Sequence, residues 1–297
     1  MKMQRRMIGL LACLLAAALA APGVSASMEA GYRPAEQKLL ERQVDQWAQG
    51  LSARPGFERI AAAQRTIEPL GPGTHGWIVL FEDQGETVGY MVVHAVREGG
   101  FALTEYGLGD APLYSADLLR QGLARLGLIG DDEDGEGSAD VERRYAHPLS
   151  AAWRVETDDG VFYLDAKTGE ELPADDPFWK EAASEAAACL EERMPGGAQP
   201  AGRLMRHAEV PSFDPYARLP WITRQPLAWA ETDIAALLGS GIELRLVAER
   251  FDGAYLYVLP VVAWHEWDDG TAYIGVDQEG LRFIPQACLE PAAKLYD

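Results

Sequence analysis

The sequence has few of the residues from which reaction centres are usually recognised. It contains three cysteines and five histidines in 297 residues. A zinc protease of the zincin type needs two histidines one helical turn apart around a glutamate, and an α/β hydrolase needs a Gly-x-Ser-x-Gly turn. Neither pattern occurs, and the histidines are scattered, with no second histidine or cysteine two to four positions away. The sequence therefore predicts no catalytic residue, no metal site and no cofactor. The five histidines are His75, His94, His147, His207 and His265.

Basic residues are also scarce. The chain has 26 Lys and Arg against 46 Asp and Glu, a formal net charge of -20 at pH 7. Such a surface repels phosphate backbones and anionic lipids, so we expect no nucleic-acid partner and no lasting membrane contact. The charge fits solubility outside the cell, and it also fits capture of a cation or a basic partner.

The first 26 residues have the features of a signal peptide. Lys2, Arg5 and Arg6 precede an apolar run over residues 7–21 that is too short for a comfortable membrane span, and residues 24–26 supply the small side chains that signal peptidase needs. We expect a protein that is secreted or lies on the extracellular face of the cell envelope. Two alternatives are an uncleaved anchor and lipidation at Cys13.

Two cysteines lie beyond this segment, Cys189 and Cys288. Export would permit a disulfide between them, which would join a linker to the last domain. Two buried thiols are the alternative.

Hydrophobic periodicity divides residues 27–112 into a helix and a meander. Apolar residues on one side of a helical wheel predict a helix over 34–51, and a second short helix is expected over 55–63. Alternating apolar residues predict strands over 76–82, 87–96 and 101–106, with short turns between them. A helix before an antiparallel meander is expected to cover one face of it.

Residues 113–180 repeat that order. A helix is expected over 115–128, with Ser115 as its cap, followed by strands over 141–145, 151–156 and 161–165. An acidic loop over 131–140 separates helix and strands. It lacks the alternating aspartates of an EF-hand, so an ordinary surface loop competes with a cation site.

The second of these units carries a family resemblance. The run from Trp153 through Asp158-Asp159-Gly160 to Tyr163-Leu-Asp-Ala-Lys-Thr-Gly169 resembles the closing hairpin of PepSY-type domains, over roughly residues 115–170. The long acidic insert departs from that pattern. The resemblance implies a helix-plus-sheet module of an exported bacterial protein, and the first unit suggests a tandem of such modules.

Residues 181–220 combine the end of a helix predicted over 177–194 with a Pro/Gly-rich linker. The last domain, 221–297, is expected to be rich in strands, with a helix over 232–238 capped by Thr232. Its strands are predicted over 243–249, 254–259, 261–267 and 271–276, with 282–284 as a further candidate and Pro260 between two of them. The hairpin from Val261 to Tyr273 is weakly similar to papain-like peptidases of the C39 type. No histidine begins its strand, so this similarity implies an inactive relative.

Three functions follow as expectations. The favoured one is a non-catalytic, PepSY-like protein of the cell envelope that binds or modulates a protein or peptide outside the membrane. The alternatives are a hydrolase relative with a papain-like fold, active or decayed, and a purely structural envelope protein. The predicted fold class is α+β, with helix-backed antiparallel sheets in tandem small modules and a C-terminal β-rich domain. Aromatic residues of the strands are either core residues or an exposed binding platform. The candidates for such a platform are Trp153, Tyr163, Trp264, Trp267 and Tyr273.

Overall fold

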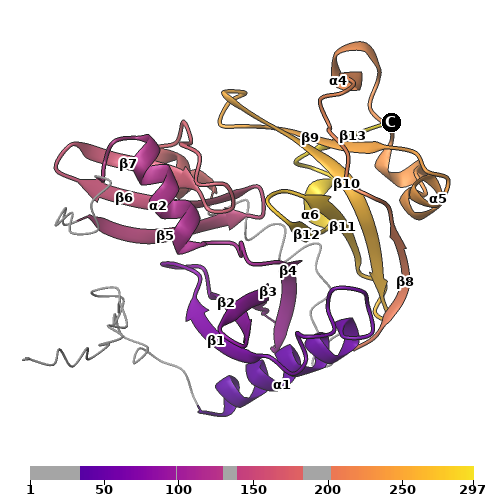
Figure 1. Cartoon of the computed structure of the whole chain (residues 1–297), viewed down its shortest axis with the longest axis horizontal. Helices are drawn as coiled ribbons and strands as arrows, with labels where there is room; N and C mark the ends of the chain where they lie inside the picture. Colours follow the sequence, from indigo (N-terminus) through magenta and orange to yellow (C-terminus); the bar gives the residue numbers. More distant parts are fainter. Residues whose placement is uncertain (1–33, 98, 130–138, 183–201) are drawn as a thin grey trace, which may run out of the picture.

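The computed structural model describes residues 34–97, 99–129, 139–182 and 202–297. The fold is α+β with antiparallel sheets, as the sequence predicted. Within the described residues, strands form a ten-stranded sheet and a separate three-stranded sheet (Figure 1). No helix of this part of the chain is both long and apolar enough to span a membrane.

The first part of the large sheet is a meander covered by one helix. Helix α1 packs across β1–β4 (Figure 1), and its buried side chains include Leu40, Val44 and Trp47. The helix and three of the strands are confirmed, and β1 is an addition, because its polar side chains gave no alternating pattern. The elements are α1 (Pro34–Leu51), β1 (Gln64–Pro69), β2 (Gly76–Asp83), β3 (Glu86–Ala95) and β4 (Phe101–Leu108).

The helix expected over 55–63 is wrong. This stretch is a series of turns, in which the amides of Phe57, Ile60 and Ala62 each bond the carbonyl three residues before. Gly56 has a φ of 85°, a left-handed conformation that interrupts a helix. Phe57 and Ile60 still reach the core under α1.

The three-stranded sheet and its helix form the second unit. Ser115 caps α2 by accepting a hydrogen bond from the amide of Leu118, as expected. The strands pair in the order β5-β6-β7. The elements are α2 (Ala116–Arg125), β5 (Asp140–His147), β6 (Ser150–Thr157) and β7 (Gly160–Asp165). Residues 130–138, which include most of the acidic loop, lie outside the described residues, as does the signal segment.

The second unit packs on the face of β2 and β3 that α1 does not cover. Along β3, Met91 and Val93 belong to the core under α1, whereas Tyr90 and Val92 contact Trp153 and its neighbours in the second unit. This division follows from the strand period of two, which sends successive side chains to opposite faces. The continuous apolar run of β3 is therefore buried on both sides.

Helix α2 lies very close to the turn after β7, and a glycine makes this approach possible. A Cβ added at Gly122 would overlap the carbonyl oxygen of Gly169 and lie 2.5 Å from the Leu164 side chain. We expect Gly122→Ala to destabilise the fold by about 1–3 kcal/mol in urea unfolding, although alanine favours helices. Gly239→Ala is the matched control, because no heavy atom lies within 4 Å of the added Cβ. It should be neutral or slightly stabilising, and equal effects of the two changes would contradict this account of the packing.

The C-terminal part extends the large sheet. Strand β12 pairs with β4 through Phe283 and Tyr106, so the first and last parts of the chain share one sheet and one core. The strands predicted in 113–180 form their own sheet, whereas those in 27–112 and 221–297 do not form separate ones. The C-terminal elements are β8 (Leu204–Glu209), α4 (Pro220–Thr223), η1 (Trp229–Glu231), α5 (Ile234–Gly239), β9 (Leu244–Arg250), β10 (Tyr255–Trp267), β11 (Ala272–Asp277), β12 (Leu281–Pro285), α6 (Gln286–Leu289) and β13 (Lys294–Tyr296).

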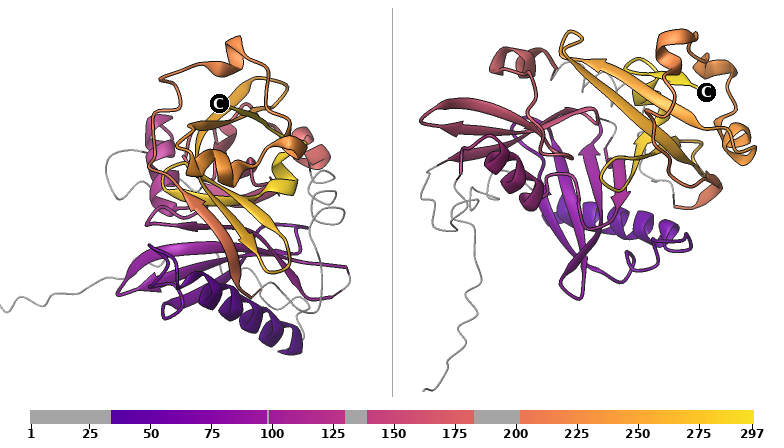
Figure 2. Two further views of the ribbon diagram at one scale, coloured as in Figure 1. Left: turned by 90° about the vertical axis from the view of Figure 1, so that its right-hand side faces the viewer. Right: turned by 45° about the horizontal axis from the view of Figure 1, so that its top comes forward.

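Three expectations for this part need correction. Residues 254–267 are not two strands divided at Pro260 but the single strand β10, which pairs with β9 up to Val261 and with β11 only from Val261 onward. Helix α5 is capped by Asp233, whose carboxylate accepts from the amide of Ala236 at 3.0 Å, and not by Thr232. The expected linker contains β8, which pairs with β10 (Figure 2 shows it running toward α1). The helix predicted over 177–194 is present at residues 176–182, and the rest of it lies outside the described residues.

Candidate functional site

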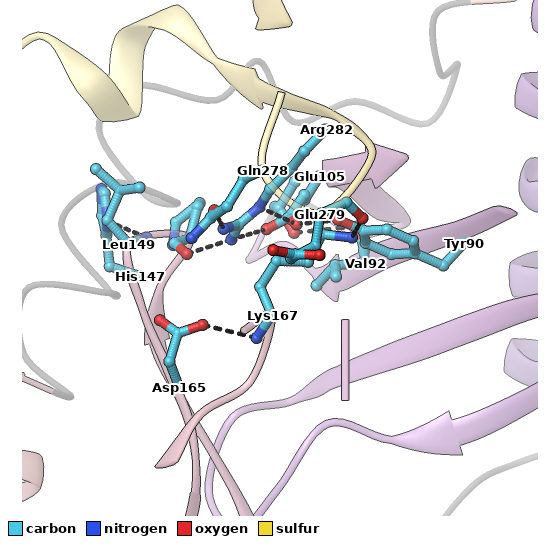
Figure 3. Close-up of polar contacts among 12 residues, drawn as sticks. Tyr90, Val92, Glu105, His147, Leu149, Asp165, Lys167, Gln278, Glu279 and Arg282 are labelled. Carbon is cyan, nitrogen blue, oxygen red and sulfur yellow. Dashed lines mark hydrogen bonds and ion pairs between the residues drawn. The ribbon is translucent and has the colours of Figure 1, made fainter. Parts of the chain in front are cut away.

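A buried ion pair lies where the two sheets meet (Figure 3). Glu105 of β4 is 0% exposed, and Arg282 of β12 is 1% exposed. Nε of Arg282 donates to Oε1 of Glu105 at 2.7 Å, and Nη2 donates to Oε2 at 3.1 Å. The guanidinium thus binds the carboxylate with two parallel bonds, the strongest geometry for such a pair.

Neighbouring groups complete this pair. The hydroxyl of Tyr90 donates to Glu105 at 2.6 Å, and the remaining guanidinium donors of Arg282 reach the side-chain oxygen of Gln278 at 2.7 Å and the carbonyl of Pro148. Burial is the largest single effect on Arg282 and opposes its charge, but Glu105, Tyr90 and Asp165 together outweigh it, so the pKa of Arg282 is raised. Since Pro148 lies between β5 and β6, the network ties the small sheet to the large one.

Lys167 makes a second tie between the sheets. Its ammonium donates to the carbonyl of Glu279 at 2.9 Å (Figure 3). It also donates to the carbonyl of Ala111. Burial, followed by the nearby positive charge of Arg282, lowers the pKa of Lys167 to about 8. Because this amine is buried and bonded to two carbonyls, it is held inside the structure and is not presented to a solute.

The string that carries the family resemblance has a structural explanation here. The carboxylate of Asp165 accepts from the amides of Lys167 and Thr168 at 2.8 and 2.9 Å and from the hydroxyl of Tyr257 at 2.5 Å. Gly169 has a φ of 67° and meets the backbone of α2. The Asp-Ala-Lys-Thr-Gly run is thus accounted for by a tight turn, a packing contact and the buried lysine.

Three histidines are buried as neutral side chains. Nδ1 of His147 accepts from the amide of Leu149 at 3.0 Å, and its Nε2 donates to the carbonyl of Cys288 at 3.1 Å. His94 bonds Thr104 at 2.8 Å, and His265 bonds the hydroxyl of Tyr106 at 2.8 Å. Burial is the main cause that lowers the pKa of His94 and His265 to about 3 and that of His147 to about 4. These side chains act as fixed hydrogen-bonding groups at neutral pH.

The aromatic residues suggested as a binding platform are all buried, so they do not form an exposed platform. Each faces a core: Trp153 packs edge-on against Tyr114 at 5.1 Å, and Tyr163 stacks on Trp179 at 5.7 Å. The physical reason is that every one of them lies on a strand face that another layer covers. Trp267 and Tyr273 belong to the core under α1, and Trp264 belongs to the core under α5.

Of the two cysteines expected to form a disulfide, only Cys288 lies within the described residues. Cys288 is buried in α6 and is disulfide-bonded. Cys189 lies outside the described residues, so the pairing of these two cysteines stays a prediction. Across the described residues, no three His, Cys, Asp or Glu side chains are grouped as metal ligands. The stretch suggested as a cation loop lies largely outside them.

An exposed apolar surface was not anticipated from the sequence. Residues 213–224, here called the arch, run over the top of the view in Figure 1 and carry α4. Tyr216 is 56% exposed, Leu219 is 44% exposed and Ile222 is 69% exposed. The proline-rich composition had indicated a linker, and the only signal for a surface site was the density of large apolar side chains within it.

The arch is fixed to the sheet at both ends. Arg245 of β9 is 1% exposed, donates to the carbonyl of Pro215 at 2.9 Å, and lies 4.7 Å from the ring centre of Phe213. At the other end Arg224 pairs with Asp297 at 3.0 Å. Trp221 packs against Tyr216 inside the arch, with 5.9 Å between ring centres. The exposed side chains are therefore displayed on a tethered segment.

Comparison with protein-family models found no match to the chain, and a search among curated proteins found none either. The expected PepSY and papain-like similarities therefore rest on the sequence pattern alone.

Proposed function

We propose that this chain is an exported, non-catalytic protein of the cell envelope that binds a protein or peptide, and that the arch is its binding surface. The observation that carries the proposal is the exposure of Tyr216, Leu219 and Ile222 within seven residues of each other. Soluble proteins seldom expose several large apolar side chains together unless a partner covers them.

The anchoring of the arch supports the same function. Binding costs less when the contact residues are already ordered, because less conformational entropy is lost in the complex. Arg245 and Arg224 hold the two ends of the arch, and the Trp221–Tyr216 contact orders its middle. By contrast, Glu105 and Arg282, the ion pair in Figure 3, are buried and bonded to each other, which suits a structural role at the contact between the sheets.

The test compares capture by three forms of residues 27–297, which include every described residue. These are the wild type, the variant Tyr216→Ser/Leu219→Ser/Ile222→Ser, and the control Val161→Ser. Val161 is 41% exposed and lies in the small sheet, away from the arch. We expect wild type and control to retain the same proteins from an extract of the producing cells' surface, and the triple variant to bind them at least about tenfold more weakly in a titration.

A broad peptidase assay of the same extract, with and without each form, asks whether binding modulates proteolysis. Circular dichroism and thermal unfolding establish that the triple variant is folded. If all three forms retain the same proteins with the same affinity, the arch is not the binding surface. If none retains any protein and proteolysis is unchanged, the proposed function is wrong.

A further inference from the structure

The arch carries a positive charge that the protein itself does not use. Arg218 is exposed between Tyr216 and Leu219, and no hydrogen bond or ion pair joins it to another described residue. Most arginines among the described residues form a hydrogen bond or an ion pair, for example Arg59 with Asp83 at 2.6 Å, and Arg42 and Arg203 share the unpaired state of Arg218.

The carboxylates close to the arch are already bound. Glu243 accepts from Arg245 at 3.0 Å, and Asp297 accepts from Arg224 at 3.0 Å. Asp214 accepts from the amide of Tyr216 at 2.9 Å and so forms a turn. Arg218 is therefore left to pair with a group from outside the molecule.

From this arrangement we infer that the arch recognises a peptide segment that presents one carboxylate flanked by apolar side chains. The inference rests on the proposed function and names the chemistry of the partner. Arginine and tyrosine are enriched among the residues that contribute most to binding at protein interfaces. A guanidinium binds a carboxylate through two parallel hydrogen bonds, which adds direction to the apolar contact.

The net charge limits the partner further. A chain with a formal charge of -20 repels a run of acidic residues or a polyphosphate at long range. One carboxylate, placed against Arg218, is paired on contact and adds little to that repulsion. The segment is thus apolar with a single acidic residue.

The experiment is a selection from a phage-displayed library of random peptides on residues 27–297. Parallel selections use Arg218→Glu and the control Arg42→Glu, which makes the same change of net charge at an exposed position of α1. We expect wild type and Arg42→Glu to enrich peptides with one Asp or Glu among apolar residues. The best of these should bind Arg218→Glu at least about tenfold more weakly, and replacing its acidic residue with lysine should restore binding to that variant.

The outcomes separate the inference from the proposed function. Enrichment of basic or uncharged peptides, which bind the wild type but not the triple serine variant, would overturn the carboxylate partner and leave the arch as the binding surface. If no enriched peptide distinguishes the wild type from the triple serine variant, both the carboxylate partner and the arch as the binding surface are overturned.

Discussion

Acidification from pH 7 to pH 5 is expected to lower the free energy of unfolding by about 6 kcal/mol. The cause is the three buried histidines, His94, His147 and His265. Their folded pKa values are about 3, about 4 and about 3, whereas an unfolded histidine has a pKa of 6.5. A loss of this size is comparable to the whole stability of many domains.

The sign of the effect follows from proton binding. At pH 5 each of these histidines is neutral in the folded protein and mostly protonated in the unfolded chain. The unfolded state thus binds more protons, so a fall in pH favours it. The stabilisation is complete above the unfolded pKa and is lost as pH falls from about 6.5 toward about 3 to 4. Each histidine then contributes about 2 kcal/mol between pH 7 and pH 5, and the result depends little on the folded pKa as long as that lies well below 5.

Urea unfolding at pH 7, 6 and 5 measures this loss directly. Replacing His94 with Gln should remove about one third of the pH dependence, whatever it does to stability at pH 7. His75→Asn is the control, because His75 is exposed and its φ of 46° suits asparagine. Its pH dependence should equal that of the wild type. A total loss below about 1 kcal/mol would mean that the histidines are not held neutral in the fold.

The secondary structure was largely predictable because most elements are covered on one face or lie between two layers. The apolar stripe of residues 34–51 and the alternation around Trp77, Val79 and Phe81 reflect burial directly. An element that is defined by strand pairing and not by burial leaves no such pattern in the sequence. Strand β8 has mostly exposed side chains and exists because β10 offers it hydrogen-bond partners. Pro260 was expected to separate two strands, but it lies inside β10, just before the pairing of β10 with β11 begins.

The ion pair between Glu105 and Arg282 was not predictable because the two residues are 177 positions apart in the chain. A local clue is present: Glu105 lies within a run of buried residues, so it must either break the strand or find a partner inside. The sequence cannot say which of its many arginines that partner is. The arch was not predicted for another reason: its proline-rich composition is typical of linkers, and its anchor Arg245 lies 30 positions after Pro215, the residue that it bonds.

Removal of the buried carboxylate is expected to have the other large effect. Glu105→Ala leaves the guanidinium of Arg282 buried without its counter-charge, and it deprives the Tyr90 hydroxyl of its acceptor. We expect a loss of about 3–5 kcal/mol in urea unfolding. Because Arg282 also bonds the carbonyl of Pro148, the contact between the sheets should loosen. Hydrogen exchange should therefore accelerate in β5 and β6 more than in α1.

The double change Glu105→Leu/Arg282→Met tests whether the loss of stability comes from an unpaired buried charge or from poorer packing. Apolar replacements of similar volume remove both charges together, so the double variant should lose much less stability than the sum of the losses of Glu105→Leu alone and Arg282→Met alone. It is not expected to be neutral, because Tyr90, Gln278 and the carbonyl of Pro148 lose partners. Arg120→Ala is the control, since Arg120 and its partner Asp117 are 69% and 79% exposed, and it should change stability by no more than about 1 kcal/mol. If the losses of stability from the two single changes add up to the loss of the double variant, Glu105 and Arg282 stabilise the contact between the sheets independently. That result would contradict the ion pair.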